Sequence, residues 1–242
     1  PLKEGNDPHR RFAKPVVYMQ HGIADSSDTW ILNTKERAPA FVAAEAGYDV
    51  WMGNARGNKY SCQHKTLKTT DAAYWDNSFV EVAKYDIPAF LEYIKQNTKL
   101  QEQQKITLVG HSQGTTDFFY GMATNPTYYS DNANLLVALG PIARMTTPSS
   151  AEKAALVAIQ FGLPVLHALG IQELASPEQT RFLPRLCGHF TGICQYFIHY
   201  VATTTSKPLD FDRFRAYFGH YPAGAGLKSF LHFGQMIESS KF

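Results

Sequence analysis

The chain has 242 residues, 44% of them hydrophobic, so it can bury a sizeable core and fits one large domain with room for an inserted subdomain. Its 23 basic and 21 acidic residues give a formal net charge of +2, and its longest basic cluster is the pair Arg10-Arg11, which argues against a nucleic-acid-binding protein. Three cysteines, Cys62, Cys187 and Cys194, are too few for a disulfide scaffold.

The first 140 residues alternate between short β-patterned runs and longer helical ones. Strands are expected at residues 15–20, 48–52, 105–109 and 135–139, and helices at 38–46, 76–97 and 113–124. We expect a kink at Pro88 within the second helix. This alternation predicts an α/β fold with a mostly parallel sheet covered by helices on both faces.

After Pro141 the strand pattern fades, and helical and loop-like segments rich in Leu, Phe and Tyr follow. Residues 154–171 are apolar, but Gln160, Pro164 and His167 interrupt them, so they do not form a membrane span. We expect two short buried or interfacial helices there, meeting at Pro164. The change in composition predicts a boundary between residues 1–140 and residues 141–242.

The motif Gly110-x-Ser112-x-Gly114 stands between a predicted strand and a predicted helix. This context is typical of a nucleophile elbow, in which a sharp turn lifts a serine out of the sheet and larger side chains in place of the glycines would collide with neighbouring backbone. We expect Ser112 to be a catalytic nucleophile. The amide of Gln113 opens the helix, so it is a free N–H suited to a developing oxyanion.

A second oxyanion donor is expected in the loop after the first strand, where the sequence reads Gln20-His21-Gly22-Ile23. Gly22 allows a tight turn that leaves the amide of Ile23 free. His21 and His111 are each adjacent to one of the two turns, and we expect both to be structural, with their rings held beside the nucleophile's loop.

Several separate segments carry a resemblance to a known family: PVVYMQHGIADSSDTWILN, AGYDVWMGNARGNKYS, YWDNSFVEVAKYDIPAFLEYI, LVGHSQGTT and HYPAGAGLKSFLHFGQMIESSKF. In their order and content they resemble the acid lipases, a family of α/β-hydrolases that includes gastric and lysosomal acid lipases. The resemblance runs from about Pro15 to Phe242. It implies an α/β-hydrolase core at 1–140, and a helical cap with the start of the return to the core at 141–242.

The resemblance also implies that the triad Asp and His follow the segment similar to residues 221–242, on two further strands. Candidates inside the chain, in the required order, are Asp210, Asp212, His220 and His232, but they lie in cap-like sequence and the resemblance aligns both histidines with non-catalytic positions. We therefore expect the sequence to be truncated before the triad acid and base. A serine without its base loses about a million-fold in turnover, so this polypeptide alone should be nearly inert.

Other motifs are interpreted as structural. Arg56, in Asn54-Ala55-Arg56-Gly57, is expected to anchor its loop, and no phosphate loop is expected because no Gly-Lys-Ser/Thr follows. The spacing of Cys187 and Cys194 is wide for zinc, so we expect neither a metal nor a cofactor. These two cysteines can form a disulfide only if they do not lie on one continuous helix.

The sequence therefore predicts a serine esterase that degrades neutral lipids, triacylglycerols or sterol esters, through an acyl-enzyme. The expected partners are the lipid ester substrate and a lipid–water interface that contacts the cap, with no nucleic acid and no stable protein partner. A secreted or lysosomal location follows from the resemblance alone. The alternative is a non-catalytic lipid-binding protein on the same scaffold.

Overall fold

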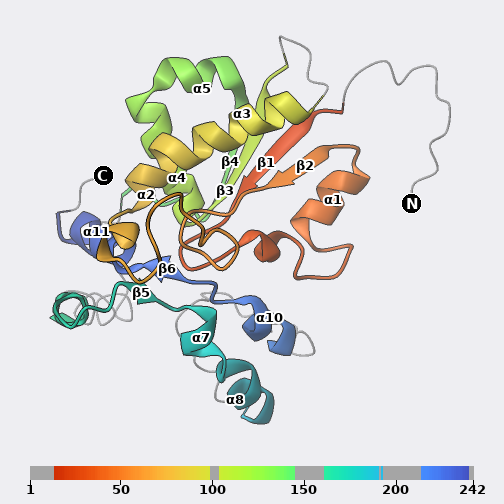
Figure 1. Ribbon diagram of the computed structural model, residues 1–242. Helices are drawn as coiled ribbons and strands as arrows, with labels where there is room; N and C mark the ends of the chain where they lie inside the picture. The colour runs from red at the N-terminus through yellow and green to blue at the C-terminus, as the bar shows by residue number, and fades with distance from the viewer. Residues whose placement is uncertain (1–13, 99–103, 145–160, 191, 193–213, 240–242) are drawn as a thin grey trace.

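The computed structural model describes residues 14–98, 104–144, 161–190, 192 and 214–239. Its centre is a four-stranded parallel sheet in the order β2-β1-β3-β4 (Figure 1). The strands are β1 (Val16–Gln20), β2 (Asp49–Met52), β3 (Ile106–His111) and β4 (Ala133–Leu139). The predicted α/β class with a mostly parallel sheet is confirmed, because each of these strands lies within two residues of its expected start and end.

Helices cover both faces of the sheet because the side chains of β1 alternate between them. Val17 and Met19 pack on one face against Ala40 of α1 (Pro39–Glu45). Val16 and Tyr18 pack on the other face in a larger cluster with buried residues of α3 (Ile87–Asn97) and α4 (Gln113–Thr124). All five residues of β1 are buried, so the centre of the core is at this strand.

The long helix expected over residues 76–97 starts later than predicted, and it is not one regular α-helix. Ser78 caps α2 (Phe79–Glu81) through a capping box with Glu81, which fixes the start at Phe79. A π-helical turn (Val82–Asp86) then leads into α3. The helix has no break before α3, since Asp86 has helical φ and ψ and the N–H of Ile87 donates to the carbonyl of Val82. The irregular turn therefore lies directly before Pro88, the residue at which a kink was expected.

Five short elements of the described chain were not predicted. The most regular is α5 (Pro126–Asn132), which begins with a proline after the capping side chain of Asn125. The others are 3₁₀ helices at Ser27–Trp30 and Ala72–Trp75 and a two-stranded antiparallel sheet of β5 (Glu173–Leu174) and β6 (Ala225–Gly226).

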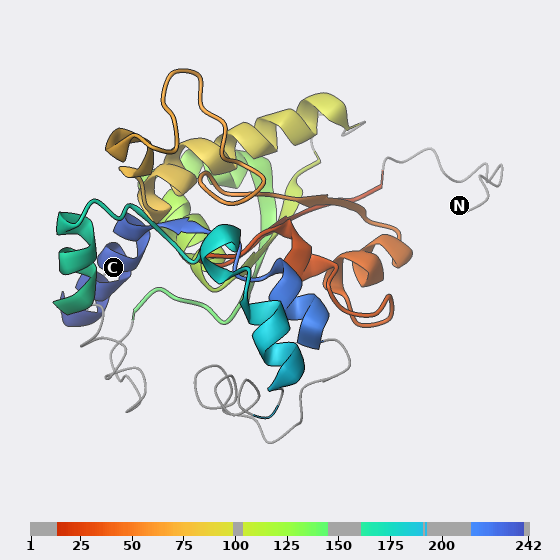
Figure 2. The same ribbon diagram turned by 60° about the horizontal axis from the view of Figure 1, so that its bottom comes forward.

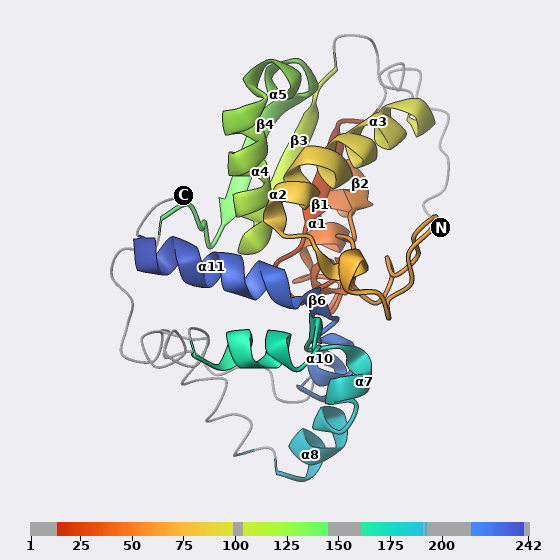
Figure 3. The same ribbon diagram turned by 60° about the vertical axis from the view of Figure 1, so that its left-hand side comes forward.

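The rest of the described chain lies beyond the carboxyl ends of the parallel strands, as Figures 2 and 3 show. It contains a helix at residues 161–168, α7 (Pro177–Thr180), α8 (Leu183–His189), α10 (Phe214–His220) and α11 (Leu227–Ser239). The expected break at Pro164 is wrong for the described residues, because residues 161–168 are helical through it. A proline removes one N–H donor, and here that loss does not end the helix. Among the described residues, no helix has the length and hydropathy of a membrane span.

Candidate active site

Ser112 lies at the junction of β3 and α4, and its backbone has φ 51° and ψ −119°. A non-glycine residue adopts such a positive φ only where its surroundings enforce it. Here the backbone N–H of Thr115 and its Oγ1 both donate to the carbonyl of Ser112, at 2.9 and 2.7 Å, while the N–H of Ser112 donates to the carbonyl of Leu139 at 3.0 Å. The turn is therefore held from the helix on one side and from β4 on the other.

The two glycines of the motif allow backbone segments to approach closely. A Cβ on Gly110 would lie 2.8 Å from the carbonyl carbon and oxygen of Gly114. A Cβ on Gly114 would lie 2.4 Å from the carbonyl oxygen of Gln20 and 2.8 Å from that of His21. The steric reason predicted for these glycines is confirmed, since backbone atoms occupy the space that side chains would need.

The loop after β1 lies directly beside Ser112. A Cβ on Gly22 would lie 3.1 Å from Cβ of Ser112, so a side chain at this position would crowd the serine. Ile23 and Gln113 line the same small cavity, of about 20 Å³. Within the described part of the chain, neither backbone N–H has a hydrogen-bond acceptor. Two residues with unused amide donors therefore line one cavity, and one of them, Gln113, directly follows Ser112 in the chain.

His21 is structural, as expected. Its ring is 3% exposed, and both of its nitrogens are engaged: Nδ1–H donates to the carbonyl of Gly22 at 2.7 Å, and Nε2 accepts from the N–H of Ala55 at 3.0 Å. Burial lowers the pKa of His21 to about 4, so the ring is neutral. His111, the last residue of β3, is exposed and lies beside the same loop, since its Nδ1 would be 3.4 Å from a Cβ on Gly22.

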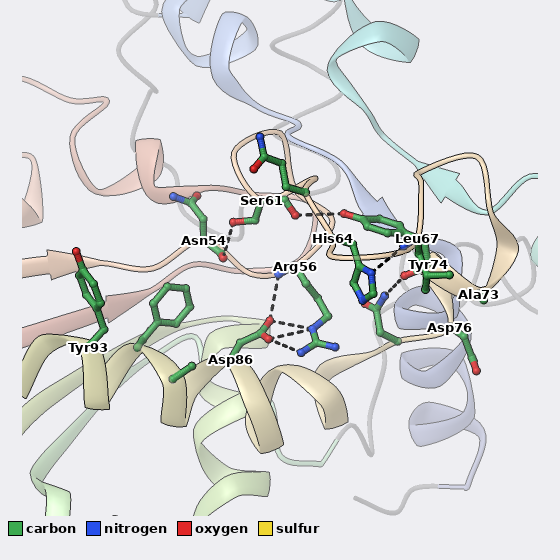
Figure 4. Close-up of a pocket in the computed structure, with 14 residues that line it drawn as sticks. Asn54, Arg56, Ser61, His64, Leu67, Ala73, Tyr74, Asp76, Asp86 and Tyr93 are labelled. Atoms are coloured by element: carbon green, nitrogen blue, oxygen red, sulfur yellow. Dashed lines mark hydrogen bonds and ion pairs between the residues drawn. The ribbon is translucent and has the colours of Figure 1, made fainter.

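Arg56 anchors its loop, also as expected. Its Nε and Nη2 donate to the carboxylate of Asp86 at 3.0 and 2.5 Å, and its backbone N–H donates to the same group at 3.1 Å (Figure 4). Hydrogen bonds and the charge of Asp86 outweigh burial and raise the pKa of Arg56. Because Asp86 lies in the π-helical turn, this ion pair joins the loop after β2 to the helices on one face of the sheet.

A further cavity lies beside this ion pair, and Ser112 is not among its lining residues. Its volume is about 550 Å³, and Figure 4 shows it between the loop at Asn54–Ser61 and the helix that carries Asp86 and Tyr93. Arg56 and Asn77 line both this cavity and the small one near Ser112. The arginine loop therefore separates the two spaces.

Of the four in-chain candidates for the triad acid and base, the two described histidines have partners other than Ser112. Nδ1 of His220 lies 2.7 Å from Oδ2 of Asp28, and Nδ1 of His232 lies 3.1 Å from Oγ of Ser78. Asp210 and Asp212 lie outside the described residues. In the described part of the chain, Oγ of Ser112 has no hydrogen-bond partner. The expectation that neither histidine is the base agrees with these contacts.

Asp28 is the centre of a charged cluster that attaches the C-terminal helices to the core. Its carboxylate accepts hydrogen bonds from Lys59, at 2.6 Å, and from Tyr60, at 3.0 Å, besides its contact with His220 on α10. Burial opposes ionisation, but these donors outweigh it and lower the pKa of Asp28. A backbone hydrogen bond from Ala223 to Ala24, of 2.7 Å, runs alongside.

Two structural features near Ser112 were not predicted from the sequence. The hydroxyl of Thr115 donates a hydrogen bond to the carbonyl of Ser112. The sequence could have indicated this contact, because Thr115 is a hydroxyl residue three positions after the serine that precedes the helix. Asp117 is fully buried on α4, where its carboxyl group lies beside the side-chain amide of Gln20. Burial, reinforced by the charge of Asp86, raises the pKa of Asp117 far above its ordinary value.

Cys187 is buried and disulfide-bonded, whereas Cys62 is free and exposed. Cys194, the other cysteine of the pairing considered from the sequence, lies outside the described residues. Among the residues that the structure describes, no group of three or more His, Cys, Asp or Glu side chains could hold a metal ion.

Residues 15–160 match the family model described as the alpha/beta hydrolase fold. The chain belongs to the alpha/beta hydrolase family. This matched range contains β1 to β4, the turn at Ser112 and the loop at Gly22. The predicted fold class and family resemblance are thus confirmed.

The chain is similar to acid lipases over almost its whole length. It is 37% identical over 238 residues to gastric triacylglycerol lipase of Rattus norvegicus, covering 95% of this chain and 58% of the relative. It is 34% identical over 235 residues to lysosomal acid lipase/cholesteryl ester hydrolase of Homo sapiens, covering 95% and 57%. A solved structure of a lipase in an open form has 17% identity and a TM-score of 0.48, covering 95% of this chain and 67% of that one. The chain thus spans less than two thirds of the length of the curated relatives.

Proposed function

We propose that the protein is a serine hydrolase that cleaves carboxylic esters of neutral lipids, with Ser112 as nucleophile. One observation carries the proposal: the strained turn at Ser112 lies beside a cavity lined by two residues, Ile23 and Gln113, whose amides are unused in the described structure. The similarity to proteins named as triacylglycerol and cholesteryl ester lipases supports the choice of substrate.

In the proposed reaction, Oγ of Ser112 attacks the ester carbonyl carbon and its proton passes to a histidine base. The carbonyl oxygen gains the negative charge, and the N–H groups of Ile23 and Gln113 donate to it. Each such donor stabilises a transition state by about 3 kcal/mol. The alcohol leaves with a proton, and water then attacks the acyl-serine to release the fatty acid. Because His220 and His232 contact other groups, we place the base outside the described residues.

The segment after β4 is proposed to be a cap that contacts lipid. Two of its helical stretches expose apolar side chains four positions apart: Phe161, Val165 and Leu169 are 67%, 57% and 71% exposed, and Phe182, Leu186 and Phe190 are 55%, 43% and 56% exposed. Side chains at this spacing lie on one face of a helix, and burying each one fully in lipid would contribute about 1.5–3 kcal/mol. The names of the relatives favour a secreted or lysosomal location.

A serine-reactive phosphonate tests the nucleophile in the full-length protein. We expect the probe to modify Ser112, and Ser112→Ala to abolish both labelling and ester hydrolysis, with a loss of about a million-fold in turnover. Ser130→Ala is the matched control, because that hydroxyl donates only to the carbonyl of Thr127 and should keep full activity. Folded protein that hydrolyses no ester and takes up no probe would instead favour the lipid-binding alternative.

A further inference from the structure

We propose that His21 is a positioning residue that fixes the direction of the Ile23 amide by holding the carbonyl of Gly22. The inference rests on the proposed function, since it assigns the Ile23 N–H to the oxyanion. In this role His21 does not touch the substrate. It acts on the site by holding the backbone of the loop that carries the Ile23 amide.

The first step is the tautomer of the His21 ring. A carbonyl oxygen only accepts hydrogen bonds, so Nδ1, which lies 2.7 Å from the oxygen of Gly22, must carry the proton. Nε2 lies 3.0 Å from the backbone nitrogen of Ala55 and 3.2 Å from Nδ2 of Asn58, and both of these groups donate. Nε2 is therefore an unprotonated acceptor. The two contacts together determine a neutral ring with its proton on Nδ1.

The second step is the geometry of the peptide bond. The carbonyl of Gly22 and the N–H of Ile23 belong to one planar trans unit, in which the two groups point in opposite directions. Glycine permits backbone rotations that would turn this unit over and direct the carbonyl toward the space beside Ser112. A carbonyl there would repel an oxyanion. The hydrogen bond from Nδ1 opposes this rotation because it holds the carbonyl on the side of His21.

The third step is the anchoring of the ring itself. Nδ2 of Asn58 also donates to the carbonyl of Asp25, at 3.2 Å, and to Oδ1 of Asn54, at 2.9 Å. The His21 ring is 3% exposed and packed between two loops, so it has little freedom to follow a rotating peptide. The loop after β2 thus fixes the ring, and the ring fixes the peptide between residues 22 and 23.

Two substitutions of His21 in the full-length protein test the hydrogen bonds of Nδ1 and Nε2 separately. His21→Asn can place an amide N–H near the position of Nδ1, and His21→Gln can place an amide oxygen near that of Nε2. We expect His21→Gln to keep KM and thermal stability near the wild-type values but to lower kcat on a soluble ester by about 100-fold. His21→Asn should keep kcat close to wild type and lower the Tm, because Ala55 and Asn58 lose their acceptor.

Asn58→Ala loosens the anchoring of the ring at Nε2 but keeps the hydrogen bond from Nδ1 to Gly22, so it should lower the Tm and reduce kcat much less than His21→Gln does. The inference is overturned if His21→Gln retains wild-type kcat, or if kcat in all three variants falls in proportion to Tm. If the wild-type protein is neither active nor labelled at Ser112, the proposed function fails together with the inference. If the wild type is active and His21→Gln has the same kcat as the wild type, the inference is rejected while the proposed function stands.

A measurement on the wild type covers the case in which a variant does not fold. In protein labelled with ¹⁵N-histidine, His21 should show a protonated Nδ1 and an unprotonated Nε2 across neutral pH. The opposite tautomer would leave no donor for the carbonyl of Gly22 and would contradict the inference.

Discussion

At the scale of single residues, the site depends on a helix and a strand that lie unusually close together. The first turn of α4 packs so near the end of β1 that a Cβ on Gly114 would lie 2.4 Å from the carbonyl oxygen of Gln20. That oxygen belongs to the central strand of the core and cannot move without disturbing it. The position of the Ser112 hydroxyl therefore depends on the absence of a side chain two residues away.

Replacing Gly114 with alanine should displace α4 from β1. We expect the free energy of unfolding to fall by about 3 kcal/mol or more, and ester hydrolysis to fall with it, because overpacking against backbone is not relieved by a change of rotamer. Chemical denaturation and turnover measure the two effects. Gly162→Ala is the control: that glycine is in a helix, nothing lies within 4 Å of its added Cβ, and its stability should not fall. Equal stability of the two variants would contradict the prediction.

Residues with a local sequence signal were predictable, whereas residues with long-range partners were not. The strand, the glycine spacing and the following helix point to Ser112 within a dozen positions of sequence. The contact between His21 and Ala55 spans 34 positions and has no such signal, although the structural role of His21 was anticipated. Asp117 was missed because a carboxyl on a helix usually faces solvent, and its burial depends on β1 and the π-helical turn, which carry its neighbours Gln20 and Asp86.

At the scale of elements, the helix at residues 161–168 differs from those that cover the sheet. Leu91 and Ile94 of α3 are at most 1% exposed, whereas Phe161 and Val165 are more than half exposed. A soluble protein seldom exposes a row of large apolar side chains without a partner for them. The proposed lipid contact supplies such a partner.

Changing Phe161, Val165 and Leu169 together to serine should weaken the proposed attachment to lipid without altering the turn at Ser112. In the full-length protein we expect hydrolysis of emulsified triacylglycerol to fall by at least about tenfold, and hydrolysis of a soluble short-chain ester to be unchanged. A double change of Phe41 and Val42 to serine is the control, since these residues are 41% and 46% exposed on α1, which lies on the sheet. Equal losses in both variants would reject the lipid contact.

Among the elements, regular periodicity was predictable and irregular backbone was not. The helix at residues 113–124 was predicted with the ends that the structure gives it, because the strand and the turn before it fix its start. The π-helical turn before α3 has ordinary helix-forming residues, so neither periodicity nor propensity distinguishes it. The short strands β5 and β6 pair across about 50 residues, and two residues carry no alternation that could be recognised.

At the scale of the whole molecule, buried ionisable groups set how stability depends on pH. Burial raises the pKa of Asp25 from 3.8 to about 6, so its contribution to stability is complete below its unfolded pKa and is lost as pH rises. Burial lowers the pKa of His21 from 6.5 to about 4, so its contribution rises with pH over nearly the same range. These two contributions to the free energy of unfolding change with pH in opposite directions and offset each other. At higher pH the change in stability therefore comes mainly from Asp117.

Asp117 has a strongly raised pKa, so its stabilising protonated form is lost progressively as pH rises above its unfolded pKa. Asp117→Asn keeps the shape and cannot ionise. We expect the variant to be more stable than wild type at about pH 8, with a difference that shrinks towards about pH 4, by up to about 1.4 kcal/mol per pH unit. Urea denaturation across this range measures it. Asp131→Asn, at an exposed position, should show no such trend, and a parallel pH profile for wild type and Asp117→Asn would reject the assignment.

The charged cluster at Asp28 has a consequence for how the molecule is made. Lys59 and Tyr60 reach Asp28 from within the first quarter of the chain, but His220 lies 192 positions after it. A ribosome has released all four strands of the parallel sheet well before it reaches α10, and chains fold from the N-terminal end as they emerge. Asp28 and Lys59 are therefore both synthesised before the four described strands are complete, and His220 can join their cluster only after those strands have left the ribosome.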